Sequence, residues 1–257
     1  MKRLAILIAA PGSDVYDATG TQQDVEHWKK HLLSKEGGAW ETNEIYPPLV
    51  NPRDIEVVAA IASTAAADYS VVTFSGHGRV EQNEDGYYVQ QLFINDRNIK
   101  WPAWRLIPKS KKGLLVLDAC RKVWNPPLLE KRASLLSANE SNETASRELY
   151  RQLFDSALDR CEMGTITLYG CNFDESAHGS NGREGYAGGL YTYSLTRAGK
   201  KWHLAPNTSG ILNVNEAHQA ASAIVTIRQP QQHPQITLGR RLGIFPFSVK
   251  PTVVTSL

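Results

Sequence analysis

Short apolar runs of strand length recur along the chain, separated by longer segments of mixed polarity. Each run is rich in Val, Ile and Leu and is bounded by Gly, Pro or polar residues, as expected for strands buried on both faces. Asp85-Gly86 is a hairpin signal directly before one of them. The runs that predict strands are 4–10, 70–75, 87–94, 114–118, 165–169 and 235–238.

Helical periodicity fills most of the intervals between these runs. We expect helices over about 22–34, from 52 onward, from about 143 to 158, over 190–198 and over 215–228. Thr21 is the expected N-cap of the first helix, after a polar loop at 11–20, and Asn51-Pro52 is expected to open the second. The second helix is expected to bury its stripe of Ile55, Val58, Ala59 and Ala62.

The alternation of strands and helices, without internal repeats, predicts the fold class. A strand joined to the next parallel strand through a helix is the unit of an α/β fold. We therefore expect a three-layer αβα sandwich with a mostly parallel central sheet, formed by a single domain over 1–257. Residues 122–142 carry Pro126-Pro127 and many polar residues, and they predict a long exposed loop within this domain.

Composition is ordinary for a globular protein and narrows the function classes. The 257 residues are 42% hydrophobic and 21% charged, with a net charge of +2 that argues against nucleic-acid or anionic-membrane partners. Three cysteines without a CxxC pair predict neither a full disulfide framework nor a zinc site, so we expect a reducing, cytoplasmic compartment. The apolar start at 4–10 is broken at once by Pro11-Gly12, which favours a first strand over a signal peptide.

Two of the predicted strands end in residues that carry chemistry. His77 follows the strand at 70–75, and Cys120 follows the strand at 114–118. Ligands of open α/β sheets bind outside the carboxyl ends of the strands, where both residues are expected. A thiol becomes a strong nucleophile beside a base, so the pair predicts a Cys-His site with Cys120 as nucleophile and His77 as base.

The residues around the pair suit attack on an amide. The tetrahedral intermediate of such an attack carries negative charge on oxygen, which backbone N–H groups stabilise. Gly78 can approach a bound carbonyl closely because it has no side chain, and the N–H of Cys120 is the natural second donor. Taken singly, His77 also fits a hydrogen-bonded structural histidine and Cys120 an inert packed thiol, and both alternatives stay open at this point.

The two motifs resemble those of a known family. Ser75-Gly76-His77-Gly78 and Asp118-Ala119-Cys120-Arg121 are similar to the paired motifs of caspase-like cysteine peptidases, in particular of metacaspases and bacterial caspase homologues. Weaker similarities occur at 169–177, 188–195 and 232–235. The resemblance implies a caspase-like fold with a large-subunit-like part at 1–121, an intersubunit-like loop at 122–142 and a small-subunit-like part at 143–257.

The resemblance also implies a substrate preference. Metacaspase relatives recognise arginine or lysine with acidic residues, so we expect cleavage after Arg or Lys. Asp118, on the strand face of Cys120, is the first candidate for the specificity pocket, with Asp174, Glu175 and Asp24 as further candidates. Each has a plainer alternative: a strand-end cap for Asp118, an ordinary loop acid for Asp174 and a helix cap for Asp24.

The implied partners are a protein or peptide substrate with Arg or Lys at the cleavage site, and a small-molecule or protein activator. We expect no cofactor, with calcium as the alternative, because the acidic cluster that binds calcium in some metacaspases is not clearly reproduced by Glu84, Asp85 and Asp96. The residues after Cys120 also depart from the His-Ser-Gly of many metacaspases. The resemblance implies a regulated protease of stress, cell-death or defence signalling.

Three alternatives remain at the level of the sequence. One is a catalytically silent caspase-like module that serves as a scaffold, and another is a Cys-His amidohydrolase acting on a small substrate. A dinucleotide-binding fold is disfavoured because no GxGxxG follows the first strand. For a peptidase, the basic residues Lys131, Arg132 and Arg147 are candidate self-cleavage positions.

Overall fold

The computed structural model describes residues 1–12, 15–123, 146–182, 184–241 and 243–252. In this part of the chain the central sheet has six strands, in the order β12-β8-β7-β3-β1-β2. All neighbouring strands run parallel except β12, which pairs antiparallel with β8. The six strands are β1 (Arg3–Ala10), β2 (Leu49–Val50), β3 (Tyr69–Gly76), β7 (Lys112–Asp118), β8 (Gly164–Tyr169) and β12 (Gln235–Thr237).

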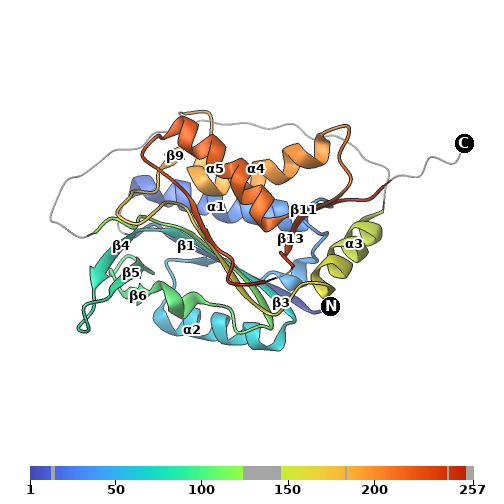
Figure 1. Cartoon of the computed structure of the whole chain (residues 1–257). Helices are drawn as coiled ribbons and strands as arrows, with labels where there is room; N and C mark the ends of the chain where they lie inside the picture. The colour runs from blue at the N-terminus through green and yellow to red at the C-terminus, as the bar shows by residue number, and fades with distance from the viewer. Residues whose placement is uncertain (13–14, 124–145, 183, 242, 253–257) are drawn as a thin grey trace, which may run out of the picture.

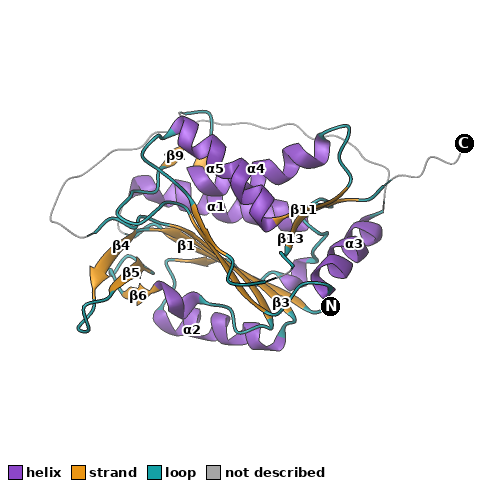
Figure 2. Cartoon of the chain, viewed as in Figure 1, coloured by secondary structure: helices purple, strands orange, loops and turns teal. Residues whose placement is uncertain are grey.

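Helices cover both faces of this sheet, which confirms the predicted α/β fold (Figures 1 and 2). The helices α1, α4 and α5 lie on one face, α2 lies on the other, and α3 lies toward one end of the strands. The helices are α1 (Val15–Leu33), α2 (Asp54–Ser63), α3 (Arg147–Asp159), α4 (Leu190–Leu204) and α5 (Val214–Arg228), with 3-10 turns at Thr42–Glu44, Thr64–Ala66 and Ala103–Leu106.

Smaller antiparallel sheets complete the described fold. A three-stranded sheet follows β3 and lies on the α2 side, and two strand pairs lie on the α4 side. These strands are β4 (Gly78–Gln82), β5 (Tyr88–Phe93) and β6 (Lys100–Pro102), then β9 (Gly179–Asn181) with β10 (Ala187–Gly189), and β11 (Gly210–Asn213) with β13 (Pro246–Lys250).

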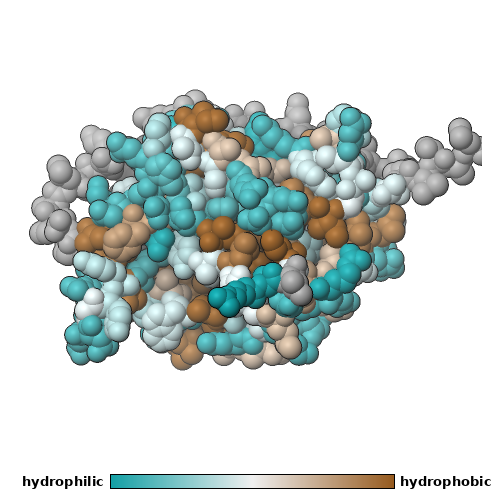
Figure 3. Space-filling model, viewed as in Figure 1, coloured by the Kyte–Doolittle hydropathy of each residue, from teal (hydrophilic) through white to brown (hydrophobic). Residues whose placement is uncertain are grey.

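The hydrophobic core is divided by the central sheet into two parts, because successive residues of a strand point to opposite faces. In β1, Leu7 is buried toward α1 and α4, whereas Ile6 and Ile8 are buried toward α2. On the face seen in Figure 3, the hydrophobic residues left at the surface form several separate patches among hydrophilic ones.

Helix α3 is fastened to the amino-terminal half of the chain by three arginines. Arg3 is buried and pairs with Asp155 of α3 at 2.5 Å. Arg151 pairs with Glu44 at 2.5 Å, and Arg147 donates to the carbonyl oxygens at 33 and 40. Together with the β7–β8 pairing, these contacts join the parts of the chain before and after residues 124–145. Residues 124–145 include most of the predicted 122–142 loop and lie outside the described residues.

Two helix starts differ from the sequence predictions. Helix α1 begins at Val15, so Thr21 lies inside the helix and is not its N-cap, and the expected 11–20 loop is shorter. The helix continues through Gly20, whose position packs against the backbone of Ser180. Helix α2 begins at Asp54 with Arg53 as its N-cap, whereas Asn51 has a left-handed backbone, with φ of 45°.

The buried face of α2 also differs from the prediction. The helix buries Val57, Ala60 and Ile61, while Ile55 is 64% exposed and Val58 is 39% exposed. Seven of the ten residues of this helix are apolar, so hydrophobic periodicity alone does not select a face. The glycine-rich stretch at 179–189 forms the β9–β10 pair.

Candidate active site

His77 and Cys120 follow the ends of two neighbouring parallel strands. Ser75 of β3 is the register partner of Asp118 of β7, and each candidate lies two residues further on. The chain stays paired beyond this point, since the N–H of Val80 donates to the oxygen of Lys122 at 2.9 Å. The segments that carry the imidazole and the thiol therefore run side by side at the carboxyl edge of the sheet, as predicted.

Gly78 is the residue at which these segments touch. A Cβ atom there would lie 2.7 Å from the backbone oxygen of Cys120 and 3.1 Å from the Cβ of Ala119. Real Cβ atoms do not approach a carbonyl oxygen so closely, which means that only glycine fits without displacement. The close packing therefore explains why a glycine follows His77: a larger residue at position 78 would push the two segments apart.

The imidazole of His77 lies over the loop between β1 and α1. Its Cδ2 atom is 3.3 Å from the position that a Cβ on Gly12 would occupy. Gly12 is held by Asn51, whose side chain accepts from the Gly12 N–H at 3.3 Å and donates to the Gly12 oxygen at 3.4 Å. Asn51, read from the sequence as a helix cap, thus supports the backbone beneath the candidate base.

Cys120 is the half-buried cysteine at this edge, with Sγ 3.7 Å from the carbonyl oxygen of Ala177. Cys171 lies beside it but is fully buried, and burial together with the neighbouring Cys120 raises the pKa of the Cys171 thiol. Cys161 follows α3, where burial also raises its pKa. A raised pKa keeps a thiol protonated and poorly nucleophilic, so the environments favour Cys120 as the reactive cysteine.

Two acids lie together at the start of α4, close to the end of the Cys120 strand. Asp118 and Asp24 are 5% and 2% exposed. Asp118 accepts from the N–H of Thr192 at 2.9 Å, and Asp24 accepts from the N–H of Gly189 at 2.8 Å. The positive end of a helix dipole and its free N–H groups stabilise carboxylate charge here.

The structure also explains the glycines that surround these acids. Ser75 donates its hydroxyl to Asp24, and the carboxylates leave no room for a side chain at Gly188 or Gly189. Asp118 is therefore bonded to the first turn of α4. Asp24 lies inside α1 and is bonded to Gly189, the N-cap of α4.

The other two acidic candidates have different partners. Asp174 is exposed, has a left-handed backbone with φ of 59° and accepts from the N–H of Val123 at 2.9 Å. Glu175 pairs with the His233 ring at 2.7 Å. Partial burial acts to raise the pKa of Glu175, but hydrogen bonds from the backbone N–H and ring of His233 hold it below its usual value.

One buried residue near the site was not singled out as functional by sequence reasoning. Gln232 is fully buried, donates to the oxygen of Gly170 and accepts from the N–H of His178. Both partners flank the loop that contains Cys171 and Ala177. The only sequence signal for Gln232 was its place at 232–235, one of the weaker similarities to caspase-like peptidases.

The described residues contain neither a metal-binding cluster nor a membrane-spanning helix. No three His, Cys, Asp or Glu side chains gather there closely enough to hold a metal ion, and Glu84, Asp85 and Asp96 form no such group. The expectations on cofactors and calcium stay predictions. Across the ranges that the structure describes, no helix is long and apolar enough to span a bilayer.

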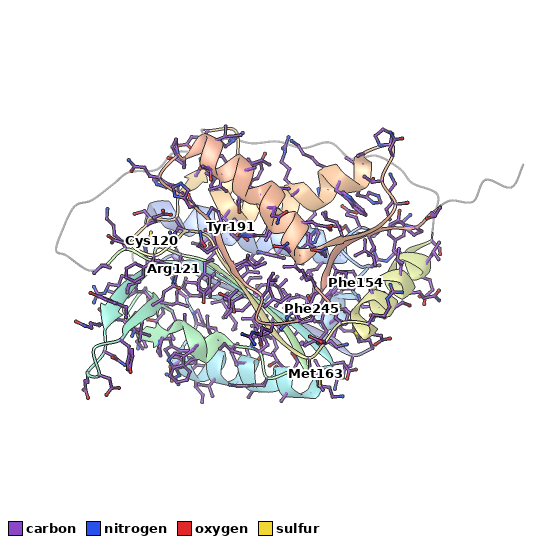
Figure 4. All side chains as sticks on the ribbon, viewed as in Figure 1. Cys120, Arg121, Phe154, Met163, Tyr191 and Phe245 are labelled. Atoms are coloured by element: carbon purple, nitrogen blue, oxygen red, sulfur yellow. The ribbon has the colours of Figure 1, made fainter. Side chains whose placement is uncertain are left out.

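Cys120 and Arg121 lie at one end of the molecule, whereas Phe154, Phe245 and Met163 lie toward the other (Figure 4).

Comparison with curated proteins finds no match. Among solved structures, the chain is similar to the crystal structure of caspase-1 from Spodoptera frugiperda, with a TM-score of 0.58 and 15% identity, over 95% of this chain and 92% of that one. The model of the caspase domain (Peptidase_C14) matches residues 3–241, and the chain therefore belongs to the caspase-domain family of cysteine peptidases.

Proposed function

We propose that the chain is a cysteine endopeptidase that cleaves after arginine or lysine, with Cys120 as nucleophile and His77 as base. The observation that carries the proposal is the register of β3 and β7, which pairs Ser75 with Asp118 two residues before the imidazole and the thiol. Membership of the caspase-domain family supports the same chemistry.

In the proposed reaction the sulfur of Cys120 attacks the substrate carbonyl carbon while its proton passes to His77. The C–S bond forms, and the C–N bond then breaks as His77 returns the proton to the leaving amine. A water molecule hydrolyses the thioester, releasing the acid and restoring the thiol. Each step uses a group that sits at or next to the carboxyl edge of the sheet.

Backbone N–H groups of Gly78 and Cys120 are proposed to bind the oxyanion. Alternate residues of a strand direct their N–H groups to the same edge, and the N–H of Val80 reaches the oxygen of Lys122. The N–H of Gly78 accordingly faces the Cys120 segment. A well-placed oxyanion donor contributes roughly 3–4 kcal/mol to the stability of the transition state.

The acid pair Asp24 and Asp118 is proposed to bind the basic side chain before the scissile bond. Both carboxyl groups lie at the start of α4, and a guanidinium can pair with carboxylate oxygens bidentately. Asp174 and Glu175 stay candidates for this role, although their contacts are with Val123 and His233.

The proposed partners are protein or peptide substrates with Arg or Lys at the cleavage site, together with a small-molecule or protein activator in a cytoplasmic setting. A role in stress, cell-death or defence signalling rests on the family alone. Cleavage within the chain's own 122–142 loop is part of the proposal, and Lys131 and Arg132 lie outside the described residues.

The test is digestion of a denatured protein mixture by the purified chain, with the new termini read by mass spectrometry. Cys120→Ala serves as the control. New termini that follow Arg or Lys, and that require Cys120, support the proposal. Termini after aspartate would contradict the specificity. If no cleavage occurs and peptide warheads fail to label Cys120, the silent scaffold module is favoured; labelling without protein cleavage favours the amidohydrolase.

A further inference from the structure

The backbone at Cys120 is held by a loop from another part of the chain. The N–H of Arg121 donates to the oxygen of Glu175 at 2.9 Å, and the N–H of Asp174 donates to the oxygen of Arg121 at 3.0 Å. The Cys120 thiol faces the oxygen of Ala177 in the same loop. The position of the nucleophile therefore depends on the 170–178 loop as well as on β7.

The carboxylate of Glu175 anchors this loop. One oxygen accepts from the N–H of Asn172 at 3.0 Å and from the N–H of His233 at 2.7 Å, and the other lies 2.7 Å from the His233 ring nitrogen Nδ1. The side chain thus joins the loop to the connection between α5 and β12, while the carbonyl of the same residue holds Arg121.

Gln232 forms the second anchor, from a fully buried position. Its amide nitrogen donates to the oxygen of Gly170 at 2.7 Å, and its amide oxygen accepts from the N–H of His178 at 3.0 Å. These two contacts bracket the loop at its start and near its end. A buried amide with both groups bonded rigidifies what it joins, because either group would be costly to leave without a partner.

We propose that Glu175 and Gln232 are positioning residues that hold Cys120 in its attacking geometry. The inference rests on the proposed function and deepens it, since it assigns Glu175 to the support of the nucleophile and not to the pocket for the basic side chain. A displacement of about 1 Å in a reacting group can lower the rate ~100-fold, so a loop that fixes this atom affects turnover strongly.

The experiment compares Glu175→Ala with Glu175→Gln in two assays. The first measures kcat and KM on a fluorogenic arginyl peptide, and the second measures the rate at which iodoacetamide alkylates Cys120, read by peptide mass spectrometry across pH. We expect Glu175→Ala to lower kcat at least tenfold with KM within about twofold, and to alter the alkylation pH profile. Glu175→Gln should recover most of the activity, because its amide oxygen still accepts the two backbone N–H groups.

Gln232 is tested by Gln232→Glu, which nearly keeps the side chain's shape. At neutral pH the new carboxylate faces the oxygen of Gly170, whereas the protonated acid can donate to it as the amide does. We therefore expect kcat relative to wild type to recover as the pH falls, a signature that a general loss of stability does not give. The test does not depend on Gln232→Ala, a variant that could fail to fold because it empties a buried position.

Two control variants separate positioning from stability and charge. Glu148→Ala removes an exposed carboxylate on α3, at the other end of the molecule, and should leave both assays unchanged. Leu158→Ala lowers stability through a core cavity and should leave kcat unchanged under conditions where it is folded.

The outcomes are distinguishable. Unchanged kcat and alkylation in Glu175→Ala would overturn the inference, and so would a raised KM confined to arginyl substrates, which would return Glu175 to the pocket. If the wild-type chain cleaves no peptide, the proposed function fails, while the alkylation assay still decides whether Glu175 and Gln232 position the thiol.

Discussion

The carboxylate of Asp118 accepts a hydrogen bond from the backbone N–H of Thr192 at 2.9 Å, linking the strand that leads to Cys120 with the first turn of α4. The nucleophile and the proposed specificity pocket are therefore built on the same strand end. A basic side chain bound at Asp118 would therefore lie at the strand end that leads to the reacting sulfur.

Replacing Asp118 tests the pocket. Asp118→Asn keeps an oxygen for the N–H of Thr192 but removes the charge, so the fold should persist while kcat/KM for arginyl peptides falls at least tenfold. Peptides with a neutral glutamine in place of arginine should be affected much less. Asp159→Asn, at the end of α3, is the matched control. An unchanged preference for arginine in Asp118→Asn would remove this residue from the pocket.

Replacing Gly78 tests the close contact between the two catalytic segments. In Gly78→Ala the new methyl group would meet the backbone oxygen of Cys120 at 2.7 Å, so one segment must move away from the other. We expect a loss of activity of at least tenfold with a modest loss of stability. Gly20→Ala is the control, because a methyl group there lies 3.7 Å from the nearest atom and should be tolerated. Full activity in Gly78→Ala would contradict the proposed oxyanion site.

The two catalytic candidates could be found from the sequence because their signal is local. A buried strand of Val and Leu that stops at a reactive side chain predicts where that side chain lies, and parallel strands end at the same edge of a sheet. Thr21 shows the limit of this reasoning. Its capping pattern is locally good, but the helix begins earlier, at Val15, so Thr21 lies inside it.

The positioning role proposed for Glu175 could not be predicted from its neighbours in sequence. From its position after β8 the side chain of Glu175 could point either toward the substrate pocket or away from it. It pairs with His233, which lies 58 residues away in the sequence. The same holds for β13, which sequence reasoning missed: Phe247 and Val249 are buried in the core by contacts with elements that are distant in the sequence.

Acid should destabilise the fold through His218. Burial lowers the pKa of His218 to about 4, and its ring lies 2.7 Å from the Tyr191 hydroxyl. An unfolded histidine titrates near 6.5, so between these values the unfolded state binds a proton that the folded state does not, and stability falls as the pH falls. The expected loss from pH 7 to pH 5 is about 2 kcal/mol for this residue.

Urea unfolding followed by tryptophan fluorescence between pH 5 and 7 measures this effect. His218→Asn keeps an acceptor for the Tyr191 hydroxyl without a titrating ring, so its stability should depend less on pH. A residual slope is expected, because burial also lowers the pKa values of His27 and His31. Identical slopes for the variant and the wild type would contradict the assignment.

Self-cleavage, if it accompanies the proposed activity, should spare Arg147. The guanidinium of Arg147 donates to the oxygens of Leu33 at 2.6 Å and Trp40 at 3.0 Å, so it is not available to an acidic pocket. Intact mass after incubation should show fragments that end at Lys131 or Arg132, and none in Cys120→Ala. The fragments should co-elute on gel filtration, because β7–β8 pairing and the Arg3–Asp155 ion pair join them. A fragment ending at Arg147 would show that α3 detaches before cleavage, contrary to these contacts.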